Sequence, residues 1–196
     1  MNLANRITIG RCCLPVVLIP ALMLDLPGAK VLALALFILG IISDAIDGML
    51  ARRLGLVNDF GRLMDPLADK ILIVSALVCF VAMPPYVVRT WMVVIIIARE
   101  FIVTGLRQLA LQSNTVMSAE TIGKHKTAWQ MIAIVALLLY YALADLQAWL
   151  PPGMNSFLAE HAPRLLQLLF YVVTLLTLLS GIIYLWRYRA LYTRHM

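Results

Sequence analysis

Long apolar runs, separated by short polar segments, constrain this chain more than any other feature. A helix that crosses a bilayer needs about 20 mostly apolar residues. We place six such runs, at residues 12–27, 31–51, 66–85, 88–108, 127–147 and 165–186. Hydrophobic residues make up 63% of the chain and charged residues only 13%, which is more apolar material than a soluble domain can cover with polar surface. The sequence therefore predicts an all-α, polytopic membrane protein with six transmembrane helices.

Little sequence remains outside these runs. No segment repeats another at a fixed period, and no long polar linker or low-complexity tail is present. We therefore predict a single membrane domain over residues 1–196, with a short N-terminal interfacial helix and short connecting loops.

The basic residues are distributed unevenly between the two sides of the predicted bundle. Six spans place both chain ends on the same side, and that side holds most of the Lys and Arg: Arg6, Arg11, Arg52, Arg53, Arg62, Lys70, Arg107, Lys124, Lys126, Arg187, Arg189 and Arg194. The opposite loops hold only Lys30, Arg89 and Arg164. Because cytoplasmic loops are enriched in basic residues, we expect both termini in the cytoplasm. A net charge of +6 on that face suits anionic headgroups and phosphorylated substrates, and no soluble basic module exists to bind nucleic acid.

Four aspartates, Asp44, Asp47, Asp65 and Asp69, lie in pairs where the second apolar run ends and the third begins. Asp44 and Asp47 are three residues apart and therefore share one face of a helix. Asp65 and Asp69 are four apart and share a face of the next helix. The connection over residues 53–60 is short enough to join antiparallel neighbours, so we expect the two pairs to face each other near the cytoplasmic boundary.

Such a group of carboxylates favours a divalent cation. Closely spaced carboxylates repel one another and take up protons unless a positive charge neutralises them. Mg²⁺ and Mn²⁺ prefer oxygen ligands, so one or two of these ions are expected. A cation at the depth of a lipid headgroup can bind a pyrophosphate and offset charge on a departing phosphate. The small residues Gly48 and Ala51 leave room for a nucleotide, and Arg52 offers a guanidinium to phosphate oxygens.

Two other interpretations of the aspartates remain open. They can pair with the nearby basic residues Arg52, Arg53, Arg62 and Lys70 as a solvated charge cluster at a helix hairpin. They can also line the ion pathway of a divalent-cation transporter or channel. Against a transporter, every carboxylate of the group lies in one hairpin with no counterpart later in the chain, whereas many transporters carry internal repeats.

The segment from Asp44 to Asp69 reads D-x2-D-G-x2-A-R-x8-G-x3-D-x3-D. It resembles the signature of the CDP-alcohol phosphotransferase family, with every specified position filled. The resemblance implies a metal-dependent transfer of a phosphatidyl group from CDP-diacylglycerol to an alcohol, with CMP leaving. It also implies a multi-pass protein of the bacterial inner membrane, with a cytoplasmic active site, that forms a homodimer through membrane helices.

The resemblance assigns roles to individual residues. Asp44, Asp47 and Asp65 would hold the metal ions, and Asp69 would both approach a metal and act as the general base. The CDP-diacylglycerol site would include small and polar residues from the first three helices: Asn5, Thr8, Gly48, Ala51, Arg52 and Gly61.

The acceptor is inferred from basic residues outside the acidic segment. Arg99 lies with Glu100 well inside an apolar run, where charge is costly and is usually functional or paired. Arg107 follows eight residues later, about two turns along the same helical face. Together with Lys124 and Lys126, these arginines would suit an acceptor that carries a phosphate.

We therefore expect glycerol 3-phosphate as the acceptor rather than serine, choline or ethanolamine. The same segments resemble the bacterial branch of the family that uses glycerol 3-phosphate. Alternatives within the family are a cardiolipin synthase, which uses phosphatidylglycerol, and an enzyme that uses inositol phosphate. For Arg99 an ion pair with Glu100 is the competing interpretation, and for the two lysines it is a role in membrane topology alone.

Overall fold

The computed structural model describes residues 3–54, 59–112 and 121–189. Within these ranges, side chains are described except at residues 3–9, 45, 47–54, 59–69, 109, 111–112 and 121–126. The described residues form helices and no strands: α1 (Leu3–Met23), α2 (Ala29–Leu54), α3 (Asp59–Ala82), α4 (Thr90–Gln112), α5 (Thr121–Asp145), the 3₁₀ turn η1 (Gln147–Trp149), α6 (Pro152–Glu160) and α7 (Ala162–Arg187). The predicted all-helical fold is therefore confirmed.

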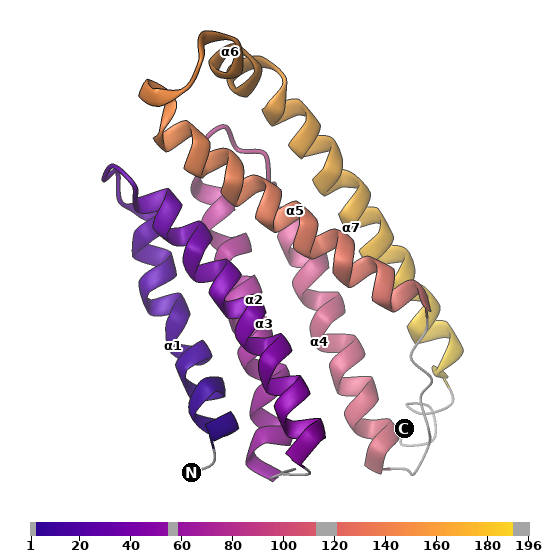
Figure 1. Cartoon of the computed structure of the whole chain (residues 1–196). Helices are drawn as coiled ribbons and strands as arrows, with labels where there is room; N and C mark the ends of the chain where they lie inside the picture. The colour runs from indigo at the N-terminus through magenta and orange to yellow at the C-terminus, as the bar shows by residue number, and fades with distance from the viewer. Residues whose placement is uncertain (1–2, 55–58, 113–120, 190–196) are drawn as a thin grey trace.

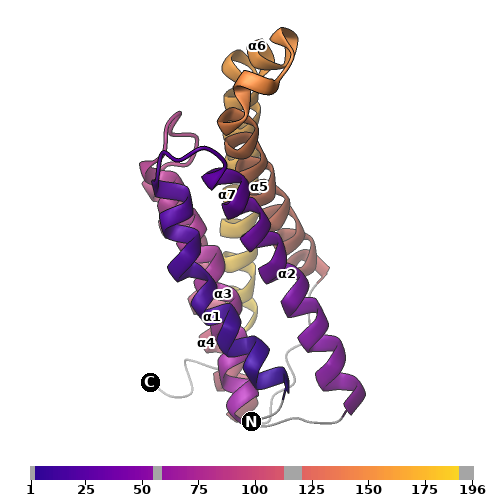
Figure 2. The same ribbon diagram turned by 60° about the vertical axis from the view of Figure 1, so that its left-hand side comes forward.

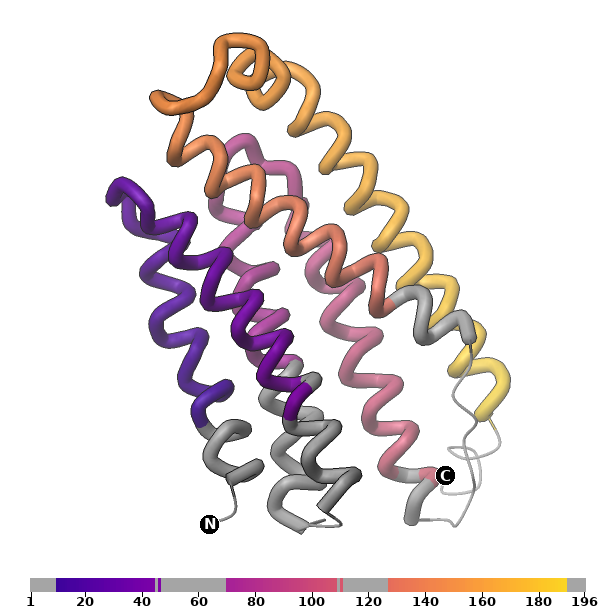
Figure 3. The backbone as a smooth tube through the Cα atoms, viewed as in Figure 1, coloured from indigo at the N-terminus to yellow at the C-terminus, as the bar shows by residue number. Residues whose placement is uncertain are grey.

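The long helices run alternately up and down in one bundle (Figures 1 and 2). Helix α1 packs against α2 and α3, α5 packs against α2 and α7, and α4 packs against α7 and α3. The Leu3 end of α1 and the Arg187 end of α7 lie at the same end of the bundle, which we call the lower end. Helix α6 lies at the opposite, upper end, as the backbone tube in Figure 3 also shows.

The core is a continuous apolar cluster to which all the long helices contribute. The aromatic rings of Phe37, Phe80 and Phe170 are fully or almost fully buried within it. Gly40 on α2 allows close approach to α3, because a Cβ atom at this position would lie 2.3 Å from Leu72 Cδ2. Burial of large apolar side chains at several helix interfaces therefore holds the bundle together.

The outer surface of the bundle is also apolar. Val16 on α1, Val94 on α4 and Leu175 on α7 are 72%, 60% and 57% exposed, and many other large apolar side chains share this orientation. A soluble protein rarely exposes so much contiguous apolar surface, whereas a bilayer accommodates it. This surface supports membrane association.

Among the described residues, residues 127–145 of α5 and the whole of α7 are long and apolar enough to cross a membrane. In α1 and α3 the side chains are described only from Gly10 and Lys70 onward, and the described apolar segments, Gly10–Met23 and Lys70–Ala82, are shorter than a span. The remaining spans of the predicted six therefore stay a prediction.

Several element boundaries differ from the predicted ones. The N-terminal interfacial helix is not a separate element, because α1 runs without interruption from Leu3 through Pro15 and Pro20 to Met23. Helices α2, α3 and α5 extend beyond the apolar runs into the turns that carry the charged residues. Backbone hydrogen bonding continues through such turns, so the end of an apolar run does not mark the end of a helix there. In the opposite direction, α1 ends at Met23 and α3 at Ala82, before the predicted ends at residues 27 and 85.

Candidate functional site

The first residue of the acidic motif is held by a buried arginine. Asp44 is on α2, and its Oδ1 accepts a hydrogen bond from Arg11 Nη1 of α1. Arg11 is 2% exposed, whereas the Asp44 side chain is about half exposed, at 49%. The sequence assigned Arg11 only to the basic cytoplasmic face. The structure instead places it between helices, where its charge orients one oxygen of the Asp44 carboxylate.

The other predicted metal and nucleotide residues are positioned by their helices alone, because their side chains lie outside the described ones. Asp47, Gly48, Ala51 and Arg52 are in the last turns of α2, and Gly61, Asp65 and Asp69 are in the first turns of α3. Asn5 and Thr8 are in the first turns of α1. Among the described side chains, no three acidic, His or Cys residues gather as a metal site. The predicted cage therefore remains untested.

A polar connection joins α3 to α4 directly after the acidic motif. Lys70, the residue that follows Asp69, donates a hydrogen bond from Nζ to Thr104 Oγ1. Thr104 in turn donates to the backbone oxygen of Glu100, one turn back along α4, at 2.7 Å. The sequence assigned Lys70 to the basic cytoplasmic face and offered it as one of the possible partners of the aspartates. In the structure its hydrogen bond to Thr104 holds α3 against α4 next to Asp69, the candidate base.

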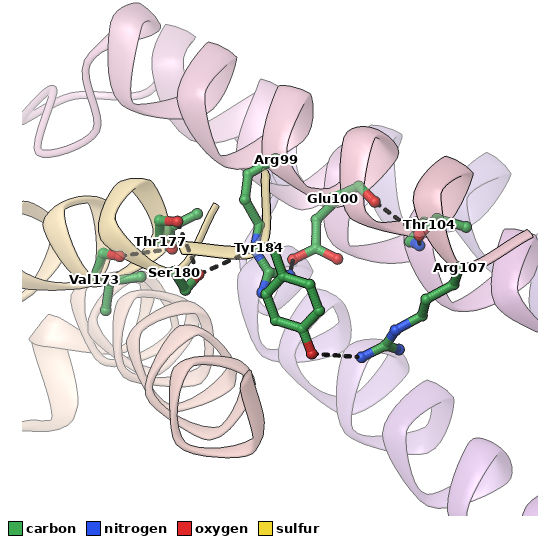
Figure 4. Close-up of polar contacts among 9 residues, drawn as sticks. Arg99, Glu100, Thr104, Arg107, Val173, Thr177, Ser180 and Tyr184 are labelled. Carbon is green, nitrogen blue, oxygen red and sulfur yellow. Dashed lines mark hydrogen bonds and ion pairs between the residues drawn. The ribbon is translucent and has the colours of Figure 1, made fainter. Parts of the chain in front are cut away.

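Arg99 is buried between α4 and α7 and has several partners (Figure 4). Its Nη1 pairs with Glu100 Oε1 at 3.4 Å, and its Nε donates to Ser180 Oγ at 3.1 Å. Gly181 makes room for this side chain, since a Cβ there would lie 3.0 Å from Arg99 Cγ. The ion pair with Glu100, one of the two interpretations of Arg99, is therefore present.

Tyr184 on α7 contacts both arginines of α4. The guanidinium carbon of Arg99 lies 5.8 Å from the centre of the Tyr184 ring, within the range of a cation–π contact. Arg107 Nη2 donates to the Tyr184 hydroxyl at 3.5 Å (Figure 4). Tyr184 is 1% exposed, whereas Arg107 is exposed. The two arginines thus share a face, as their spacing predicts, and the tyrosine fixes how they lie relative to each other.

Sequence reasoning missed what α7 contributes, because Ser180 and Tyr184 look like ordinary polar residues of an apolar helix. One signal was available: Thr177, Ser180, Gly181 and Tyr184 are three, one and three residues apart, which places small and polar residues on one face of α7. Such a face in a membrane helix is typical of a helix interface that accommodates polar partners.

Lys124 and Lys126 complete the predicted acceptor site. Both are in the first turns of α5, and their side chains lie outside the described ones. The described part of the site therefore consists of the Arg11–Asp44 pair and the network that links Lys70, Glu100, Arg99 and Tyr184. Asp44, which is oriented by the buried Arg11, can bind a cation. Arg107, which is oriented by the buried Tyr184, can bind a phosphate.

Comparisons with known proteins agree with the motif. Residues 1–176 match the family described as CDP-alcohol phosphatidyltransferase. A CDP-diacylglycerol–glycerol-3-phosphate 3-phosphatidyltransferase of Bacillus subtilis (strain 168) is 38% identical over 172 residues, covering 76% of this chain and 86% of that protein.

Proteins with the same name from other organisms are also similar. That of Rickettsia bellii (strain RML369-C) is 36% identical over 138 residues, covering 70% of this chain and 75% of that protein. The protein of Arabidopsis thaliana that carries this name with the number 2 is 28% identical over 184 residues, covering 88% of this chain and 78% of that protein. The chain therefore belongs to the CDP-alcohol phosphatidyltransferase family and is a transferase.

Proposed function

We propose that this protein transfers the phosphatidyl group of CDP-diacylglycerol to glycerol 3-phosphate in phospholipid biosynthesis, forming phosphatidylglycerophosphate and CMP. The observation that carries the proposal is the unbroken acidic motif from Asp44 to Asp69 in a chain that matches the family over residues 1–176. The names of the relatives support the choice of acceptor.

Asp69 is the proposed general base. Its carboxylate would accept the proton of the acceptor's hydroxyl group while the hydroxyl oxygen attacks the lipid-bearing phosphorus. A bond forms between that oxygen and the phosphorus, the bond from phosphorus to the CMP oxygen breaks, and CMP leaves. The contact between Lys70 and Thr104 supports this role, because it holds the adjacent turn of α3 in place against α4.

Asp44, Asp47, Asp65 and Asp69 are the proposed ligands of one or two Mg²⁺ or Mn²⁺ ions. The donor set fits such ions, since it consists of carboxylate oxygens. Only Oδ1 of Asp44 bonds Arg11, and its second oxygen has no hydrogen-bond partner among the described residues. When bound, the metal would neutralise charge on the pyrophosphate.

The acceptor's phosphate is the proposed ligand of Arg107, Lys124 and Lys126. Arg107 is exposed and is oriented by Tyr184, so it can reach a soluble substrate. Arg99 was predicted in the same group, and its burial among Glu100 and Ser180 favours a supporting role for it in orienting Tyr184. Asn5, Thr8, Gly48, Ala51, Arg52 and Gly61 are the proposed CDP-diacylglycerol site.

We place the protein in the bacterial inner membrane as a multi-pass homodimer with its lower end in the cytoplasm. The apolar outer surface and the position of both described chain ends at the lower end support this arrangement. The excess of basic residues near that end supports the orientation.

The test is CMP release from CDP-diacylglycerol by detergent-purified protein, with glycerol 3-phosphate, phosphatidylglycerol, inositol phosphate, serine or no acceptor present. We expect release with glycerol 3-phosphate and little with the others. Robust release with phosphatidylglycerol or inositol phosphate would reassign the acceptor within the family. No release with any acceptor would contradict the proposed transfer and would be the behaviour of a cation transporter.

A further inference from the structure

A small, mostly enclosed cavity of about 30 Å³ lies between α3, α4 and α5. Its polar wall is formed by Lys70, Glu100, Thr127 and Gln130, which come from all three helices. A volume of this size holds a water molecule or one hydroxyl group, and it excludes a phosphate.

Gln130 lacks a partner in this cavity wall. The residue is 3% exposed, and its Oε1 has no hydrogen-bond partner among the described residues. Buried amide groups are almost always hydrogen-bonded, so an unsatisfied one indicates a missing partner. Because rotation of the amide exchanges its oxygen and nitrogen, Gln130 can either accept from or donate to a small group in the cavity.

The cavity lies about one to two helical turns from the candidate site residues on all three helices. Ile73, another lining residue, follows Asp69 by four residues on α3, and Gln130 follows Lys126 by four on α5. On α4, Glu100 precedes Arg107 by seven residues, or about two turns. In each helix the candidate site residue lies on the lower side of the cavity-lining residue and near the same face. The cavity therefore adjoins the upper side of the site that these residues would form.

We propose, resting on the proposed function, that this cavity receives the middle hydroxyl of glycerol 3-phosphate and that the Gln130 amide is its hydrogen-bond partner. Glycerol 3-phosphate presents a terminal hydroxyl to the base and a phosphate to the basic residues. Its middle hydroxyl then needs a partner of its own once the acceptor is enclosed. Gln130 thereby determines specificity for an acceptor with a hydroxyl at that carbon.

The test compares two acceptors, glycerol 3-phosphate and 3-hydroxypropyl phosphate, which keeps the terminal hydroxyl and the phosphate but lacks the middle hydroxyl. For the wild type we expect kcat/KM to be at least about 30-fold higher with glycerol 3-phosphate, because a site that hydrogen-bonds a hydroxyl rejects the analogue without it. In Gln130→Met, which keeps the length of the side chain without the amide, this ratio should fall to about 3-fold or less.

The ratio within one variant does not depend on how much of the protein is folded, so partial misfolding of Gln130→Met cannot imitate the result. Gln167→Met on α7, a half-buried glutamine away from the cavity, is the matched control and should keep the wild-type ratio. An unchanged ratio in Gln130→Met, or a wild type that uses both acceptors equally, would overturn the inference. A wild type that releases no CMP with glycerol 3-phosphate would instead contradict the proposed function itself.

Discussion

Tyr184 shows how a single side chain can organise charges inside an apolar bundle. Its ring faces the Arg99 guanidinium and its hydroxyl accepts a hydrogen bond from Arg107, although Tyr184 is 77 residues from Arg107 in the sequence. Charged groups among membrane helices are costly unless they are paired. A neutral residue that contacts both arginines orients them without adding an opposing charge.

The first prediction concerns the hydroxyl of Tyr184. Tyr184→Phe keeps the ring against Arg99 and removes only the hydrogen bond to Arg107. We expect the KM for glycerol 3-phosphate to rise about 3- to 10-fold, because the hydroxyl no longer orients Arg107. The rise should be no larger, because Arg107 is exposed and its hydrogen bond to Tyr184 is long, at 3.5 Å. The KM for CDP-diacylglycerol should stay unchanged in steady-state assays of CMP release.

Tyr171→Phe is the matched control, since Tyr171 is on the same helix and contacts Trp91 instead of the arginines. It should behave as the wild type. Equal increases of both KM values in Tyr184→Phe would indicate that the tyrosine only supports the fold.

The second prediction concerns the proposed base. Asp69→Asn keeps the shape of the side chain but removes the proton acceptor, so turnover should fall by about 100- to 10,000-fold. The variant should remain folded, as judged by its elution from a size-exclusion column. Asp25→Asn, in the fully exposed aspartate of the α1–α2 connection, should retain wild-type turnover. Wild-type rates in Asp69→Asn would remove Asp69 from the mechanism.

At the residue scale, the sequence predicted the groups whose spacing lies within one hairpin or one helix. The pair Arg99 and Arg107 belongs to this class and is confirmed by the contacts of both residues with Tyr184, whereas the grouping of the four aspartates stays a prediction. Contacts between distant helices were not predictable, because no local pattern pairs Arg11 with Asp44 or Arg99 with Ser180. The role of Gln130 was missed for the same reason, since its cavity has walls from three helices.

At the scale of the helices, apolar run length predicted that each long helix exists but not where it ends. Helix α3 begins at Asp59, seven residues before the predicted span at residue 66, so its first three turns carry the second half of the acidic motif. The turn η1 and the helix α6 were not predicted, because these segments are too short and too polar to form a span. Close helix contacts depend on small residues, and Gly40 is the clearest example.

The third prediction tests this contact. In Gly40→Val, the added side chain would collide with Leu72 and Leu14, so these two side chains or α2 itself must shift. Overpacking of this kind costs about 1–3 kcal/mol, and for a chain of this size we expect the melting temperature to fall by about 5 °C. Gly105→Val, at a helical glycine with no atom within 4 Å of its Cβ position, should lower it less. Equal shifts would show that the close approach at Gly40 contributes nothing.

At the scale of the whole molecule, the described chain ends and the acidic motif belong to the lower end of the bundle, and α6 to the upper end. This polarity follows from helices that alternate in direction and from basic residues concentrated near one end. The proposed topology therefore predicts that the lower end of the bundle faces the cytoplasm.

The fourth prediction tests that orientation by labelling single cysteines in spheroplasts, with Cys12, Cys13 and Cys79 first replaced by alanine. Ser156→Cys on α6 should react with a membrane-impermeant maleimide added outside, because this exposed residue is at the upper end. Gln108→Cys, an exposed residue near the lower end of α4, should react only after the membrane is permeabilised. The reverse pattern would invert the topology.

The central claim is that carboxylates at the lower end act through a bound divalent cation, and metal removal tests it most directly. Purified protein is treated with EDTA, and CMP release in the presence of glycerol 3-phosphate is measured before and after Mg²⁺ or Mn²⁺ is restored. We expect the rate to fall by more than about 100-fold and to recover when either ion is added. An undiminished rate in the metal-free protein would contradict the account.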